Sequence, residues 1–71
     1  MYFFHTQIGT FKIIRQAGRW HVMLNDEGLG SYPSPLQALD DLVGGHTHFP
    51  ACGTDPSTLD IPDELSEWAS R

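Results

Sequence analysis

Cysteine is nearly absent from this sequence of 71 residues, since Cys52 is the only one. A single cysteine forms no internal disulfide, which excludes the disulfide scaffolds of small secreted domains. No hydrophobic run approaches the roughly 20 residues that a membrane-spanning helix needs. The apolar start, MYFFHTQIGTF, also lacks the basic flank and small-residue cleavage pattern of a secretory signal. We therefore expect a cytoplasmic protein with no membrane partner.

Positive charge is also scarce and unevenly distributed. The chain has four lysines and arginines against nine aspartates and glutamates, a net charge of −5. Up to Leu24 it carries three cations and no acid, whereas from Asn25 onward it carries nine acids and only Arg71. A weakly basic first part is thus joined to a strongly acidic remainder.

A chain of this length provides one small domain with one core. The segments YFFHTQ, TFKIIRQ and WHVMLND are rich in aromatic and β-branched residues, and turn-forming IGT, QAGR and NDEG separate or end them. A shorter strand, LGSY, follows. In the third strand, Trp20, Val22 and Leu24 face the core and leave His21 and Met23 outside. Residues 1–33 are predicted to form an antiparallel meander of three to four strands with one apolar face.

The segment SPLQALDDLVGG predicts a helix over residues 34–43 that covers this face, which makes the fold class α+β. Ser34 is positioned to cap the helix, Pro35 suits its first position, and Gln37 completes a capping box. Gly44 is predicted to end the helix in the left-handed conformation.

A loop over residues 44–59 and a short amphipathic helix over residues 60–69 are predicted to complete the domain. Glycines and prolines punctuate the loop. Asp60 is placed to cap the short helix, whose apolar edge of Ile61, Leu65 and Trp68 would fold back onto the sheet or the first helix.

The segments TQIGTFKI, GRWHVMLNDEGLGSY and SPLQALDDL together resemble a family of short bacterial proteins. That family pairs a Trp-containing β-meander with a Ser-Pro-capped helix ending in paired acids. The resemblance covers residues 2–43 and implies a bacterial or phage protein of this fold, but no activity. The order of strands followed by a helix is also similar to small DNA-contacting domains of some integrases, a likeness of topology alone.

The loop GGHTHFPACGTD contains candidate metal ligands. His46, His48, Cys52 and Asp55 are residue types that bind zinc, and a zinc-stabilised module is one alternative function. Structural zinc sites, however, draw their ligands from separated segments, whereas these four lie on one strip. The competing interpretation is a surface loop in which Phe49 plugs the core and Cys52 is a small buried filler. We favour that interpretation and expect no cofactor.

Catalysis at a Cys–His pair is not expected. A thiolate nucleophile needs a base, an orienting third group and an oxyanion site in a concave pocket. A chain of this size has little room to enclose a small-molecule substrate. We therefore predict a protein that is not an enzyme.

Acidic residues provide the favoured functional hypothesis. Asp40 and Asp41 lie near the C-terminal end of the predicted helix, where the helix dipole disfavours negative charge. The acidic surface continues along the tail through Asp60, Asp63, Glu64 and Glu67. We predict a small acidic binding protein whose partner is another protein, for example a basic groove of nucleic-acid-handling machinery that it would inhibit. The competing interpretation is that these charges only keep the protein soluble.

Cations near one predicted hairpin support the alternative of a nucleic-acid-binding domain. Lys12, Arg15 and Arg19 lie close to Trp20, and a basic, aromatic sheet face is typical of single-strand binding. Three cations are few, because electrostatic affinity scales with the number of phosphates neutralised. Ordinary solubilising charge at a hairpin is the favoured explanation of these cations, and a protein partner is expected ahead of nucleic acid.

Overall fold

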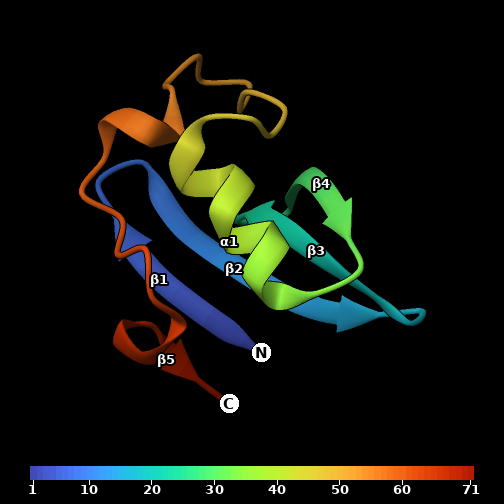
Figure 1. The fold of residues 1–71 in the computed structure, drawn as a ribbon. Helices are drawn as coiled ribbons and strands as arrows, with labels where there is room; N and C mark the ends of the chain where they lie inside the picture. Colours follow the sequence, from blue (N-terminus) through green and yellow to red (C-terminus); the bar gives the residue numbers. More distant parts are fainter.

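In the computed structural model, which describes residues 1–71, a five-stranded antiparallel sheet packs against one α-helix (Figure 1). The predicted α+β class is confirmed. The elements, in chain order, are β1 (Tyr2–Thr6), β2 (Gly9–Gln16), β3 (Arg19–Leu24), β4 (Glu27–Tyr32), α1 (Pro35–Gly44), two 3₁₀ turns (Pro56–Thr58 and Leu65–Glu67) and β5 (Ala69–Ser70).

The strand order is β4-β3-β2-β1-β5, so the first four strands form the predicted meander. The fifth strand was not predicted. It pairs antiparallel with β1 at the opposite edge from β4, with Tyr2 opposite Ser70 and Phe3 opposite Ala69. The C-terminal residues therefore cover the first part of the edge that β1 would otherwise leave unpaired.

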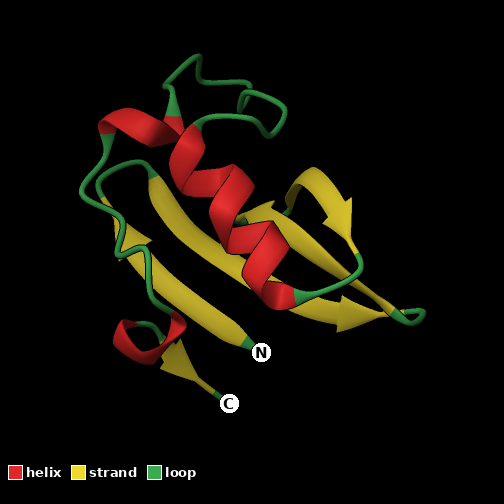
Figure 2. Cartoon of the chain, viewed as in Figure 1, coloured by secondary structure: helices red, strands yellow, loops and turns green.

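The register assigns each strand residue to one of two faces, because directly opposite residues in neighbouring strands share a face. Phe11, opposite both Phe4 and Leu24, is fully buried beneath α1, as are Ile13 and Val22. Figure 2 shows the helix lying across this side of the strands. No helix covers the opposite side, which we call the open face.

Asn25, in the turn between β3 and β4, is hydrogen-bonded to Thr10, next to the turn between β1 and β2. The Asn25 side-chain oxygen accepts a hydrogen bond from the Thr10 N–H at 3.0 Å, and the Asn25 N–H donates to the Thr10 carbonyl at 2.9 Å. Gly9, at φ 139°, allows this approach, because a Cβ there would lie 2.5 Å from the Asn25 amide nitrogen. Two turns distant in sequence are thus fixed to each other.

Helix α1 begins as predicted and ends one residue later. The Ser34 hydroxyl accepts a hydrogen bond from the Gln37 N–H at 3.2 Å, and Pro35 occupies the first turn. Gly45, not Gly44, takes the left-handed conformation, at φ 76°, and its N–H bonds back to the last turn. Gly44 and Gly45 are adjacent, and a glycine at either position is suited to end the helix in this conformation. None of the helices has the length and apolar character that crossing a membrane requires.

The prediction of a helix over residues 60–69 is wrong, although the predicted packing of its apolar residues is confirmed. Ile61 and Trp68 are buried in the core and Leu65 packs against it. The segment forms only one 3₁₀ turn, before which no side chain provides a cap. So short a segment is a marginal helix, whereas the β1 edge offers it hydrogen bonds. The Trp68 indole N–H then donates to the Pro62 carbonyl at 3.0 Å.

Candidate functional site

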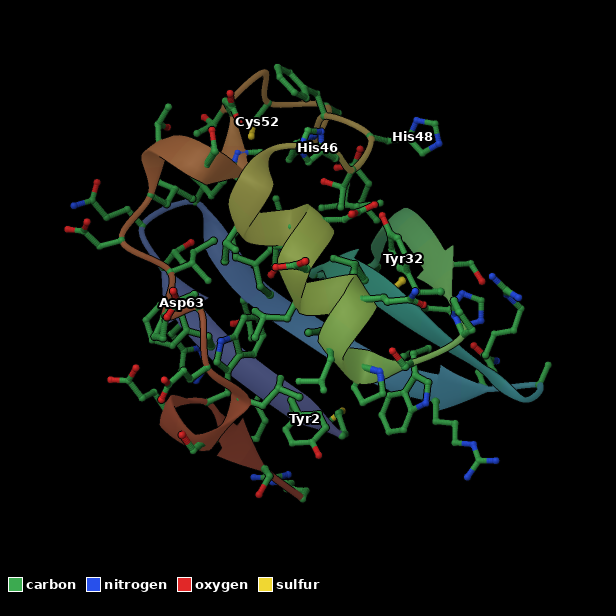
Figure 3. All side chains as sticks on the ribbon, viewed as in Figure 1. Tyr2, Tyr32, His46, His48, Cys52 and Asp63 are labelled. Carbon is green, nitrogen blue, oxygen red and sulfur yellow. The ribbon has the colours of Figure 1, made fainter.

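The loop after α1 brings no metal-binding group together. No three histidine, cysteine, aspartate or glutamate side chains in the chain are placed to hold one ion. Figure 3 shows His48 pointing outward, on the side away from Cys52. The Asp55 carboxylate caps the following 3₁₀ turn, accepting from the Ser57 N–H at 2.9 Å and the Ser57 hydroxyl at 2.8 Å. The side chains of His46, His48, Cys52 and Asp55 are therefore not arranged as a zinc site.

The competing interpretation of this loop was also wrong in its details. Phe49 is 56% exposed and Cys52 is exposed, so neither fills the core. The buried members are Thr47, Pro50 and Pro56, none of which the sequence singled out. Phe49 and Cys52 were expected to be buried because aromatic residues and cysteines are buried on average. In this loop the backbone conformation decides which side chains are buried.

Two contacts fix the loop to strand β4. The Glu27 carboxylate accepts from the Ala51 N–H, at 3.1 and 2.9 Å to its two oxygens, and the His48 N–H donates to the Leu29 carbonyl at 3.0 Å. The loop is therefore held by hydrogen bonds to carboxylate and backbone.

Removal of metal is accordingly expected to leave the fold unchanged. Purified protein incubated with a chelator should melt at the same temperature as untreated protein, because hydrogen bonds fix the loop in place of metal ligands. Differential scanning calorimetry measures this. One equivalent of tightly held zinc, lost on replacing His46 and Cys52 by alanine, would contradict the prediction.

Asp41 has a structural role that the sequence did not reveal. Burial raises the pKa of Tyr32 to about 12, and a hydrogen bond to the Asp41 carboxylate and its charge add to the effect. The hydroxyl thus stays protonated and available as a donor. This contact gives a reason for a carboxylate in the last turn of a helix. Asp41 therefore faces Tyr32 of β4.

Asp40 and Asp63 are brought together. They line one hollow between α1 and the tail, with Leu36, Gln37 and Leu39 as its other members. Leu36 is 68% exposed, the largest exposure of any large hydrophobic side chain. We call Leu36, Gln37, Asp40 and Asp63 the acid–leucine patch. No cation lines this hollow.

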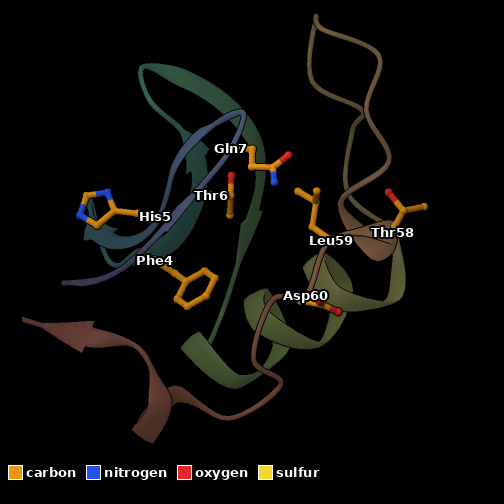
Figure 4. A pocket seen from close by; sticks show the side chains of 7 residues that line it. All are labelled: Phe4, His5, Thr6, Gln7, Thr58, Leu59 and Asp60. Atoms are coloured by element: carbon orange, nitrogen blue, oxygen red, sulfur yellow. The ribbon is translucent and has the colours of Figure 1, made fainter.

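The other predicted acidic residues are dispersed. Glu64 follows Asp63 directly, and Glu67 is exposed farther along the tail. Asp60 belongs to a different hollow of about 400 Å³, between β1 and residues 58–60 (Figure 4). His5, which also lines it, points away from its other side chains. No acid–base pair therefore faces the largest hollow.

The predicted basic residues divide between the two faces of the sheet. Arg15 lies opposite Trp20, on the side that α1 covers, whereas Arg19 and Lys12 lie on the open face. The Arg19 side chain is held there by hydrogen bonds to the Ser31 hydroxyl at 2.7 Å and the Ser31 carbonyl at 3.2 Å. The four residues of the predicted nucleic-acid surface thus do not form one surface.

A further cation joins the open face from the tail. The Arg71 guanidinium carbon lies 5.5 Å from the centre of the Phe3 ring, and Phe3 is opposite Lys12 in the register. The sequence did not place Arg71 on this face, because strand β5 was not predicted. Comparisons with family models, curated proteins and solved structures find no match to this chain.

Proposed function

We propose that the protein is a non-enzymatic binding module whose acid–leucine patch holds a basic segment of a partner protein. The observation that carries this proposal is one exposed leucine that shares a hollow with two carboxylates. Leu36 shares a hollow with Asp40 and Asp63, and no positive side chain reaches it.

An apolar side chain and carboxylates have complementary roles at a protein interface. Burying Leu36 under a partner removes apolar area from water, which contributes about 25 cal/mol per Å² before the costs of association. Carboxylates at the rim attract lysines and arginines, speed association and exclude acidic partners. A partner of matching chemistry presents an apolar side chain surrounded by lysine or arginine.

Solubility alone explains the patch less well. Charge that only maintains solubility requires no large apolar side chain beside it, and an exposed leucine works against that purpose. Asp41 is accounted for by Tyr32, but Asp40 is exposed and has no hydrogen-bond partner in the fold. No contact within the fold therefore accounts for the Asp40 carboxylate.

The partner class that this patch supports is a basic protein surface. Nucleic-acid-handling proteins present such surfaces in the grooves that bind phosphates. A small acidic domain seated there would exclude the nucleic acid, so we propose an inhibitor-like role.

The test is binding of a short synthetic peptide of lysine and leucine to ¹⁵N-labelled protein, followed by NMR. We expect shifts around Leu36 and a Kd that rises with salt, since exposed charges are screened beyond about 10 Å at 0.1 M. Asp40→Lys should weaken binding roughly fivefold or more, because one attraction becomes a repulsion.

Asp26→Lys provides the matched control, because Asp26 is exposed in the turn between β3 and β4, away from the patch. It changes the net charge identically and should leave the Kd within about twofold of the parent. Equal effects of the two reversals, or no effect of Leu36→Ala, would reject the patch as the binding site.

A further inference from the structure

The open face of the sheet carries positive side chains, and no acidic side chain of the strands lies on it. Glu27 is the only acidic residue within the strands, and it lies opposite the buried Leu24, on the covered side. The other carboxylates lie in the turn at Asp26, in α1, and in the loop and tail that follow it. Three of the four cations, Lys12, Arg19 and Arg71, belong to the open face.

From this segregation we infer a second binding surface: the open face binds single-stranded nucleic acid, through Lys12, Arg19 and Arg71 to phosphates and through Phe3 to a base. This inference goes beyond the proposed function and involves the opposite side of the molecule. The sequence as a whole has four cations and nine acids. In the fold, three of these cations share the open face, whereas Glu27 of β4 and both aspartates of α1 lie on the covered side.

Screening makes the separation effective. The molecule measures 29 × 22 × 20 Å, so the solvent side of α1 lies across its thickness from the open face. The Debye length is about 10 Å at 0.1 M salt. Carboxylates on the α1 side therefore repel a strand on the open face only weakly.

The aromatic and basic groups lie in adjacent positions. One row across the strands contains Ala69, Phe3, Lys12, Met23 and Gly28. The rings of Phe3 and His5 form an edge-to-face pair with centres 5.8 Å apart. Aromatic side chains interleaved with cations are the arrangement on which single-stranded bases stack while their phosphates are neutralised.

A shallow hollow of about 260 Å³ is located at this row. Phe3, His5, Lys12 and Arg71 line it, with Met1 and Thr10 completing its wall. The His5 imidazole Nδ1 is 2.7 Å from the Thr10 hydroxyl oxygen, which orients the ring. Single strands, whose bases are unpaired, suit such a hollow better than a duplex, whose bases are stacked inside.

Fluorescence anisotropy of a labelled oligothymidylate tests the inference with the full chain. At about 50 mM salt we expect a Kd of about 10⁻⁴ M or tighter. Three neutralised phosphates give a slope of about −2 for log K against log [salt] on a single strand, hence roughly 20-fold weaker binding at 200 mM. A flat salt dependence, or no binding at 50 mM, would overturn the inference.

Matched variants locate the surface. Lys12→Gln should weaken binding roughly 5- to 10-fold, whereas Arg15→Gln, the same loss of one charge on the covered side, should leave it nearly unchanged. Phe3→Leu keeps an apolar side chain but removes the ring and should also weaken binding. Equal losses at Lys12 and Arg15 would mean that net charge alone is sensed, which contradicts a specific face.

Two further measurements need no variant of the open face. In the parent protein, the methyl signals of Ile14 and Met23 should shift on adding oligothymidylate, and those of the inward Ile13 and Val22 should not. Asp40→Lys should not weaken this binding, which separates it from the acid–leucine patch. If polyglutamate competes as well as oligothymidylate and Phe3→Leu has no effect, the face recognises acidic protein and the nucleic-acid inference is wrong.

Discussion

Replacing Leu39 by alanine is expected to lower the free energy of unfolding by about 2–5 kcal/mol. Leu39 is 2% exposed and belongs to the one hydrophobic core, together with Ala38 and Leu42 of the same helix. Its removal loses transfer free energy and leaves a cavity under α1. A small domain has roughly 5–15 kcal/mol of stability in total, so the loss is a large fraction.

Leu36→Ala is the matched control on the same helix. It makes the same chemical change, but Leu36 is 68% exposed, so the expected effect is within about 0.5 kcal/mol. Urea unfolding followed by tryptophan fluorescence measures both variants. If Leu39→Ala unfolded at the same urea concentration as the parent, α1 would not cover the sheet as the structure shows.

The meander and helix α1 could be predicted because their signals are local. Alternation places Val22 and Leu24 on one face and His21 and Met23 on the other, whichever strand pairs with them. The Ser34 cap likewise depends on residues within one turn of the helix. Such signals do not require knowledge of distant parts of the chain.

Two predictions that depended on distant contacts failed: the helix in the tail and the burial of Phe49 in the loop. The conformation of the tail is set by the free edge of β1, which lies more than 60 residues away and invites a strand. The loop is positioned by Glu27 and Leu29 of β4, which leaves Phe49 in solvent. Neither partner can be identified from the composition of the segment itself.

The candidate surfaces also depend partly on local signals and partly on contacts between distant parts of the chain. Alternation along β2 puts Lys12 and Arg15 on different faces, although they are close together in the chain. Arg71 joined the open face only through β5. Asp40 and Asp41 are neighbours in sequence, yet a helix turns consecutive residues by about 100°, so one faces solvent and the other faces Tyr32. Surfaces depend on pairing and rotation more than on proximity in sequence.

Replacing Trp68 by alanine is expected to cost about 3–5 kcal/mol, the largest effect of any change in the tail. Trp68 is 5% exposed, its ring centre lies 5.8 Å from that of Phe4, and its indole N–H donates to the Pro62 carbonyl. These contacts hold the tail against the sheet. Thermal unfolding followed by circular dichroism measures the loss.

Glu67→Ala, at an exposed position next to the tryptophan, is the control and should change stability by no more than about 0.5 kcal/mol. Trp68→Phe retains an aromatic ring and removes the indole donor, so its loss of stability should lie between those of Glu67→Ala and Trp68→Ala.

Trp68→Ala also tests both proposed surfaces, because the tail supplies Asp63 to the acid–leucine patch and Arg71 to the open face. Trp68→Ala should therefore weaken lysine–leucine peptide and oligothymidylate binding together, even at temperatures where the protein stays folded. If the variant were as stable as the parent, the tail would contribute little to the core, and its residues could not position either surface.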